Sequence, residues 1–394
     1  MYKTIVSVFC GCLLTLSVHA QFASIDSVLV QVEQHNHELR ALREMAEARI
    51  LELKSTNNLP DPVVEAFYFP FGDHTSGDYT EFQISQSLEF PSVYGARSKL
   101  ISQQMDHLAF DYQEKRQDVL ADAKDLCNTL VYLHKRLETE SGRLEQARRV
   151  HDQISELHDS GQVGILDLNK AKVVWMQEQH KFQQLESDLK STQRLLININ
   201  GGQDIAFEGG AYEGAVTLPD LDTLWNEKLV IDPALVKLNH QEAIARRSLE
   251  LTKAQSLPNL TAGYNRQGVS GAYYSGIYAG ITIPLWSNQN KVKAAQSQIN
   301  FQQSNTHART AVLYGEFEKA YREYQIRSLE FNNYTTTLGA LDSEALLLEA
   351  YQLGEMAYLE YYIELKFYKD AYDTMLQMEY ELYLAKNKLL QHQL

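Results

Sequence analysis

The sequence has little cysteine and, beyond its first 20 residues, no long apolar run. Of its three cysteines, Cys10 and Cys12 lie within those first residues, so Cys127 is the only one further along the chain. One cysteine cannot form an intrachain disulfide, and no cysteine stands where a lipid anchor needs one. No later segment approaches the roughly 18 to 20 consecutive apolar residues of a transmembrane helix. The sequence therefore predicts no disulfide scaffold, no membrane-helix anchor and no lipid anchor.

Positive charge is also scarce, and the motifs of catalysis are missing. The chain has 36 Lys and Arg against 51 Asp and Glu, a formal charge of −15, which argues against binding to nucleic acid. No nucleophile motif, cofactor loop or metal-ligand cluster is present. Of the 12 histidines, His35 and His37 do not share a helix face, and His151 and His158 lie two turns apart. We expect no enzymatic activity, no cofactor and no bound metal.

The first 20 residues have the pattern of a secretory signal peptide. Lys3 precedes an apolar run from Ile5 to Val18, and Val18-His19-Ala20 is a small-residue cleavage pattern. We predict cleavage after Ala20. The sequence therefore predicts an exported protein.

Proline is rare, and two long stretches, Ser92 to Ser160 and Leu285 to Leu353, contain none. Each stretch follows a proline and ends at a glycine, 70 residues apart in both cases: Pro91 to Gly161 and Pro284 to Gly354. A helix of this length extends about 100 Å at about 1.5 Å per residue. The sequence predicts two long helices that are copies of each other.

Both predicted helices carry a heptad seam, which is stable only when partner helices cover it. In the first, Glu140 and His151 interrupt the seam of Leu126, Leu130, Leu133, Leu137, Leu144, Ala147 and Ile154. In the second, Arg327 interrupts the seam of Leu313, Phe317, Ala320, Tyr324, Phe331, Tyr334, Leu338, Leu341, Ala345 and Leu348. Two predicted flanking helices, Ile25 to Asn57 and Ile165 to Ile199, together have the length of the first long helix. Laid end to end, they would cover its seam.

Short alternating segments precede each long helix. Residues 79–90 place Phe82, Ile84 and Leu88 on one side and polar residues on the other, which is the period of a β-strand. With residues 62–71 this segment predicts a β-hairpin. A second hairpin is predicted from residues 259–268 and 274–285.

The order of elements occurs twice, at an offset of 193 residues (Pro91 to Pro284). We divide the chain into a signal peptide (1–20), a first repeat of helix, hairpin, helix and helix (21–199), a Gly-rich linker (200–220) and a second repeat (221–394). In the second repeat, the helix from Leu221 to Ser256 is broken at Asp232-Pro233, and a final helix extends to about Gln391.

The four predicted strands have the length of tilted transmembrane strands, about 9 to 11 residues. An open sheet edge in lipid leaves backbone groups unpaired, so a spanning sheet must close. Four strands are too few to enclose a pore, and several chains would have to share one barrel. Its lumen would then be lined by the polar side of the second strand: Glu81, Gln83, Ser85, Ser87 and Glu89. The alternative is a soluble pair of hairpins packed on the helices.

This duplicated order resembles the TolC family of outer-membrane efflux proteins. The resemblance covers the whole mature chain and rests on Leu59-Pro60-Asp61 and Leu257-Pro258-Asn259 before the hairpins, on residues 280–286 closing the second, and on an acid six residues after each glycine. It implies long coiled-coil helices forming a periplasmic tunnel, and a homotrimer whose twelve strands form one barrel in the outer membrane. It also implies a periplasmic adaptor protein and an inner-membrane pump as partners.

The resemblance assigns the turns after the long helices to the periplasmic tip, where the adaptor docks and the closed channel narrows. The matching tip positions are Gly161, Gln162, Val163, Gly164, Gly354, Glu355, Met356 and Ala357. Family members have acids six and nine positions after the second glycine. Here the first is Glu360, but the second position is Ile363, with Glu364 one residue later. Asp167 has the equivalent place in the first repeat.

Independently of the resemblance, three copies of Glu360 around one axis would attract cations and repel each other. The alternative for Glu360 and Glu364 is an ordinary solvated helix face. For the whole chain, the alternatives are a periplasmic adaptor and a structural coiled-coil protein of the cell envelope. A tandem repeat with two hairpins argues against the first, and alternating strands argue against the second. The sequence does not identify the cargo, which a pump would select.

Overall fold

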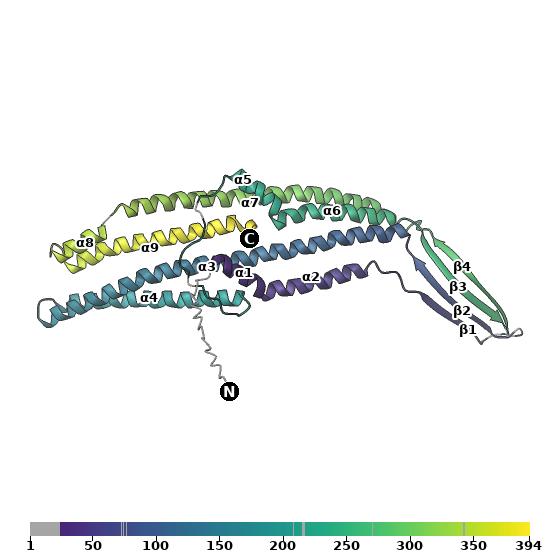
Figure 1. Cartoon of the computed structure of the whole chain (residues 1–394), viewed down its shortest axis with the longest axis horizontal. Coiled ribbons are helices and arrows are strands. Elements are labelled where there is room, and N and C mark those ends of the chain that lie inside the picture. The colour runs from purple at the N-terminus through teal and green to yellow at the C-terminus, as the bar shows by residue number, and fades with distance from the viewer. Residues whose placement is uncertain are drawn as a thin grey trace, which may run out of the picture.

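The computed structural model describes residues 24–394 apart from 72, 74, 76, 208, 215, 216, 270 and 342. The predicted signal peptide lies outside the described residues. The molecule is elongated, with a four-stranded sheet at one end and, at the other, the two turns that connect consecutive helices (Figure 1). The helices in order are α1 (Ile25–His35), α2 (His37–Ser55), α3 (Pro91–Asp159), α4 (Ile165–Ile199), α5 (Leu221–Ile231), α6 (Pro233–Ala254), α7 (Lys291–Gly339), α8 (Ser343–Gln352), α9 (Tyr358–Leu389) and the 3-10 helix η1 (Gln391–Gln393). The strands are β1 (Val63–Phe69), β2 (Tyr79–Leu88), β3 (Asn259–Val269) and β4 (Ala272–Thr282).

The first long helix, α3, is continuous over 69 residues, as predicted. Pro91 occupies its first turn, where the missing N–H has no helical partner to lose. The helices α1, α2 and α4 all contact α3, so the predicted covering of its seam is confirmed. The main core lies where α1, α2, α3 and α4 meet, and it contains Val28, Val32, Leu39, Ala123, Leu130 and Leu196.

The prediction of one helix from Ile25 to Asn57 is wrong, because the chain breaks at Asn36. The backbone of Asn36 is extended, and its Oδ1 accepts a hydrogen bond from the N–H of Leu39 at 2.9 Å. Its side-chain amide donates to the carbonyl of Ile199 at 2.7 Å. Asn36 thus caps α2 and ties it to the end of α4. The predicted break at Asp232 in the second repeat is confirmed and has the same chemistry, with Asp232 Oδ1 accepting from the N–H of Ala234 at 2.9 Å.

The second long helix is not the continuous copy that the spacing predicts. It begins only at Lys291, preceded by Asn290 in a left-handed conformation with φ of 63°, and α7 ends at Gly339 before α8 starts. Residues 335–337 are three consecutive threonines and are followed closely by Gly339; both residue types are poor helix formers. The predicted seam residues Leu341 and Leu348 are 52% and 42% exposed. This part of the seam is therefore only partly covered in the single chain, although α9 contacts α8.

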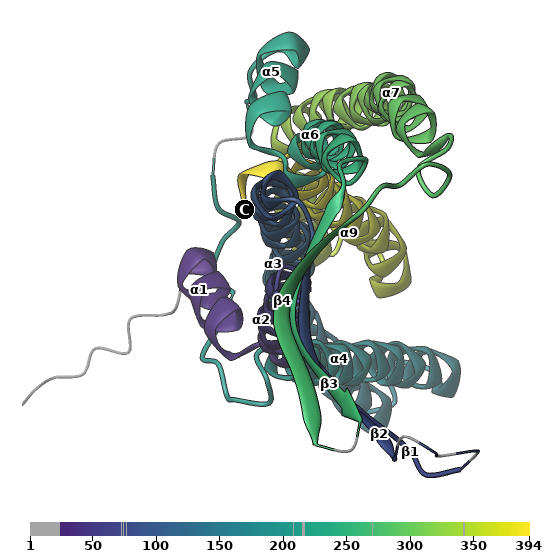
Figure 2. The ribbon, with the colours of Figure 1, turned by 90° about the vertical axis from the view of Figure 1, so that its right-hand side faces the viewer.

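Despite this difference, the second repeat packs like the first. The helices α6 and α9 contact α7, and α6 and α9 also contact α3, which joins the two repeats along their length. Viewed from the sheet end, α1 and α5 lie at the outside of the helical bundle (Figure 2). No helix within the described ranges is long and apolar enough to cross a membrane.

The four strands form one antiparallel sheet in the order β1-β2-β3-β4. Both predicted hairpins are confirmed, and the strands end within a few residues of the predicted limits. The central pair joins the repeats: β2 runs against β3 from Tyr79 opposite Val269 to Leu88 opposite Leu260. The outer edges of β1 and β4 pair with no other strand among the described residues.

Candidate functional site

The two turns after the long helices have the same backbone geometry. The N–H of Gly161 donates to the carbonyl of His158 at 2.9 Å, and the N–H of Gln162 donates to Leu157 at 2.9 Å. After α8, Gly354 donates to Tyr351 at 3.1 Å and Glu355 to Ala350 at 3.0 Å. These paired bonds are Schellman motifs, which require a left-handed residue. The glycines meet this requirement, with φ of 75° and 78°.

Both turns lie at the same end of the molecule, opposite the sheet (Figure 1). All of the predicted tip positions are in them. Gly164 is the N-cap of α4 and Ala357 is the N-cap of α9. Val163 packs against the small cluster of Val150, Ile154 and Ala171, which fixes the first turn between α3 and α4.

The predicted gate acids are exposed and stand at equivalent helix positions. Asp167 is the third residue of α4, and Glu360 is the third residue of α9. A Glu360 carboxylate oxygen accepts the N–H of Ala357 at 3.0 Å, and Asp167 lies 3.7 Å from Lys170. Acids in the first turn favour the helix dipole, so each has a local structural role. Glu364 is also exposed, one turn further along α9.

The strands separate polar and apolar side chains onto opposite faces of the sheet. Glu81 accepts a hydrogen bond from Asn265 at 2.5 Å, Gln83 donates to the Tyr278 hydroxyl at 2.7 Å, and Ser87 bonds to Thr261 at 2.9 Å. Ser85 lies on the same face of β2. This cross-strand network makes one face of the sheet polar over β2, β3 and β4.

The opposite face is apolar and open to solvent in the single chain. Phe82 and Ile84 of β2 are 43% and 39% exposed, and Ile277 and Ile281 of β4 are 91% and 64% exposed. An exposed apolar surface of this kind normally meets lipid or another protein. No helix among the described residues covers this face (Figure 1), so the alternative of hairpins packed on the helices is not what this fold contains.

Glu89 differs from the other predicted lumen residues, because it lies beyond the end of β2. Its carboxylate pairs with Arg97 of α3 at 2.6 Å. Glu89 therefore connects the sheet to the first turns of α3.

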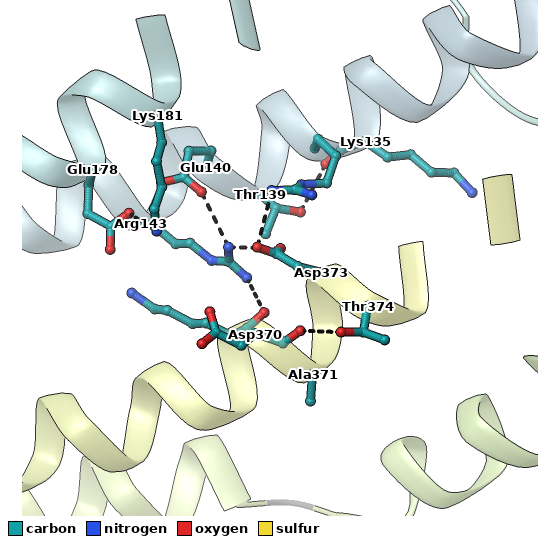
Figure 3. Close-up of polar contacts among 12 residues, drawn as sticks. Lys135, Thr139, Glu140, Arg143, Glu178, Lys181, Asp370, Ala371, Asp373 and Thr374 are labelled. Carbon is teal, nitrogen blue, oxygen red and sulfur yellow. Dashed lines mark hydrogen bonds and ion pairs between the residues drawn. The ribbon is translucent and has the colours of Figure 1, made fainter. Parts of the chain in front are cut away.

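A buried charged cluster joins α3, α4 and α9 (Figure 3). Its α3 residues lie in the half of that helix that leads to the first turn. Glu140 and Glu178 are 0% and 2% exposed, and their carboxyl groups lie close enough for the charge of Glu178 to act on Glu140. Arg143 donates to Glu140 at 3.3 Å, to Asp373 of α9 at 2.9 Å and to the backbone carbonyl of Lys369 at 2.9 Å. From the sequence, Glu140 was identified only as an interruption of the heptad seam of the first long helix. Arg143, three residues later on the same face, was the available sign of a buried ion pair.

Burial and the neighbouring carboxylate set the protonation of this cluster. Burial, the hydrogen bond with Glu178 and the negative charge of Glu178 raise the pKa of Glu140 to about 7. Burial also acts to raise the pKa of Glu178, but the bond from Glu140 and the charge of Lys181 outweigh it and lower that pKa. Lys181 lies 3.2 Å from Glu178.

A groove of about 680 Å³ separates α4 from α9 on the side of the turns. Val173 and Met176 of α4, both more than half exposed, line one wall. Tyr362 and Lys366 of α9 line the other. Within the described part of the chain, no three His, Cys, Asp or Glu side chains are grouped so that they could hold a metal ion.

No family model matches the sequence, and no curated protein matches it, but solved structures match its fold. The Campylobacter jejuni CmeC outer membrane channel is 14% identical, with a TM-score of 0.73, over 93% of this chain and 85% of that chain. CusC, which forms a transmembrane channel, is 14% identical, with a TM-score of 0.75, over 94% and 92%. The outer membrane protein VceC of Vibrio cholerae is 12% identical, with a TM-score of 0.71, over 93% and 95%. At this identity the likeness establishes the fold, and the resemblance predicted from the sequence is confirmed at that level.

Proposed function

We propose that this chain, which has the fold of outer-membrane channels, is a passive exit duct of an efflux system. It assembles as a homotrimer, spans the outer membrane with its strands and extends its helices into the periplasm. The observation that carries the proposal is the match to such channels over more than nine tenths of the chain. The separated faces of the sheet and the duplicated helical hairpins support it independently of the match.

The sheet supplies the physical argument for a trimer. Its two edges, β1 and β4, have unpaired backbone groups in the single chain, and each such group costs several kcal/mol in lipid. Pairing β4 of one chain with β1 of the next removes both edges. Three chains with four strands each give twelve strands, enough to enclose a water-filled lumen.

The orientation of the two faces of the sheet follows from what surrounds a barrel in a membrane, with lipid outside and water in the lumen. The apolar face with Ile277 and Ile281 contacts lipid, and the polar face with Glu81, Gln83, Ser85 and Ser87 lines the lumen. Glu89 lies at the junction between barrel and tunnel and braces α3 through Arg97.

The native mass of the protein extracted from membranes tests this assembly. We expect a mass of three chains in detergent, recovered from the outer-membrane fraction. A stable monomer from the soluble periplasm would overturn the proposal and favour a periplasmic adaptor or a structural coiled-coil protein instead.

At the periplasmic end, the two turns form the tip that contacts an adaptor protein, which connects the duct to an inner-membrane pump. The groove between α4 and α9 begins beside this tip and offers Val173 and Met176 as apolar contacts. Replacing both with serine should weaken capture of a co-expressed adaptor without changing the native mass. Unchanged capture would remove the groove from the docking surface.

Glu360 is the residue we assign to the gate, with Asp167 and Glu364 as further acids near the tip. Three copies around the trimer axis favour passage of cations. The variant Glu360→Gln should lower the cation preference of the reconstituted channel, while Gln still accepts the N–H of Ala357 and preserves the cap. Glu349→Gln, an exposed change on α8, is the matched control. Equal ion selectivity in wild type and Glu360→Gln would exclude Glu360 from the constriction.

A further inference from the structure

The buried pair Glu140 and Glu178 is the least expected feature of the helical part of this fold. Two carboxyl groups that are both out of water and in contact cannot both be ionised without a large cost, since each loses hydration and repels the other. They come from different helices, α3 and α4, and α9 covers them (Figure 3). Their protonation therefore concerns three helices at once.

Charged and titratable groups face the pair from each of these helices. On α3, Arg143 bonds to Glu140. On α4, Lys181 bonds to Glu178. On α9, the Tyr362 hydroxyl donates to Glu178 at 3.3 Å, and the positive charge of Lys369 favours the ionised form of Glu178. Asp373 accepts a hydrogen bond from Arg143. Burial and the negative charge of Asp370 raise the pKa of Tyr362.

Among the acids of this cluster, Glu140 has the weakest contact with a cation to compensate for its burial. Its contact with Arg143 is 3.3 Å long, whereas Asp373 holds the same guanidinium at 2.9 Å. Glu178 has both Lys181 and Tyr362. The Glu140 Oε1 atom is buried and has no hydrogen-bond partner among the described residues. A proton on Glu140, donated to Glu178, satisfies the pair with the atoms present.

We propose that Glu140 and Glu178 hold one proton between them, and that release of this proton loosens α4 and α9 from α3. With the proton bound, the pair carries one negative charge, and Arg143 donates its hydrogen bonds to Asp373 and to the carbonyl of Lys369. Without it, Glu140 and Glu178 repel each other, and the ionised Glu140 competes with Asp373 for Arg143. The repeats are then joined less firmly in the half of the bundle that leads to the turns.

The direction of the pH effect follows from which state binds the proton. Between the ordinary pKa of a glutamic acid and the raised pKa of Glu140, the folded protein binds a proton that the unfolded chain has released. Raising the pH through this interval therefore favours unfolding. The lowered pKa of Glu178 adds no slope there, because Glu178 is ionised in both states above its ordinary pKa.

Thermal unfolding of the full-length protein across pH 5.5 to 8.5 tests the proposal. We expect Glu140→Gln, which imitates the protonated state, to unfold at a temperature that rises relative to wild type as the pH rises. Comparing the variant with wild type at each pH cancels the contributions of other groups, including the half-buried His107 and the buried His392, whose pKa values are both lowered by desolvation. Glu145→Gln, an exposed change on the same helix, should keep a constant difference. A constant difference for Glu140→Gln as well would overturn the proposal.

Two further measurements make the test specific to the pair. Infrared spectra of the wild-type protein near pH 6 should contain a band of a protonated buried carboxyl group that disappears by pH 9 and is absent from Glu140→Gln. Glu178→Gln should lose it as well, because the amide of Gln donates to Glu140 and stabilises its ionised form. Absence of the band from wild type would refute the shared proton, whether or not the variants fold.

Hydrogen exchange locates the loosening. After correction for the intrinsic effect of pH on exchange, backbone amides of residues 174–182 and 366–377 should exchange faster at pH 8.5 than at pH 6. Those of α1 should not change. Equal protection at both pH values in all of these segments would show that proton release does not move α4 or α9.

Discussion

The variant Arg143→Ala should destabilise the protein severely, because Arg143 connects α3 to α9 inside the buried cluster. It bonds to an acid on each of these helices and to a backbone carbonyl of α9. The Arg143 side chain is 7% exposed, and its guanidinium has three partners: Glu140, Asp373 and the carbonyl of Lys369. Removing one member of a buried ion pair typically costs about 3–5 kcal/mol, since the partner remains buried without compensation. Asp373 is 20% exposed and keeps its contact with Arg136 at 3.2 Å, so we expect a loss at the lower end of this range, about 3 kcal/mol per chain.

Denaturant unfolding in detergent, followed by far-ultraviolet circular dichroism, measures this loss. Arg149→Ala is the matched control: it lies on the same helix, its side chain is 69% exposed, and its contact with Glu145 is 3.8 Å long. An exposed pair of this kind contributes about 0–1 kcal/mol. If Arg143→Ala and Arg149→Ala unfold at the same denaturant concentration, the cluster does not hold the repeats together and the reasoning fails.

Two other predictions concern backbone geometry. Gly161→Ala should destabilise by about 1–2 kcal/mol, because alanine is strained at the left-handed position, whereas Gly142→Ala, in the middle of α3 with open space around it, should stabilise by about 0.5–1 kcal/mol; equal signs in thermal unfolding would contradict the assigned turn. Asn36→Ala should cost about 1–2 kcal/mol by removing a buried cap, and more than Ser24→Ala, which removes an exposed one; the same unfolding experiment compares them, and a larger effect at Ser24 would be inconsistent with the tie between α2 and α4.

The repeated order of elements could be predicted from the sequence because each element has a local signal. The alternation around Phe82 and Ile84 has the period of a strand, and the interval from Pro91 to Gly161 has the composition of an unbroken helix. The Schellman turns at Gly161 and Gly354 follow from glycine, which alone adopts the left-handed conformation at little cost. The glycine turns and the alternation of β2 therefore lie where the sequence predicts them, and the roles of these residues at a tip and in a lumen stay predictions.

The misses have a common physical cause. The break at Asn36 depends on the carbonyl of Ile199, more than 160 residues away in the chain, so a helical pattern could not reveal it. Between α7 and α8 the poor helix formers at residues 335–339 permit a break, and packing against other helices is too sparse there to keep the helix continuous, since Leu341 and Leu348 are 52% and 42% exposed. In both places local propensity permitted more than one backbone path, and distant contacts selected between them.

The sequence by itself determined the periodicity, the turns and the duplication, because hydrophobic spacing and the conformational limits of proline and glycine act over a few residues. Only the tertiary structure decided which charges are buried together. Glu140, Glu178 and Asp373 lie on three helices that are separate in the sequence. They meet because α4 of the first repeat and α9 of the second repeat both pack on α3. The pKa of a carboxyl group depends on the water and charge around it, and that environment exists only after those helices have packed.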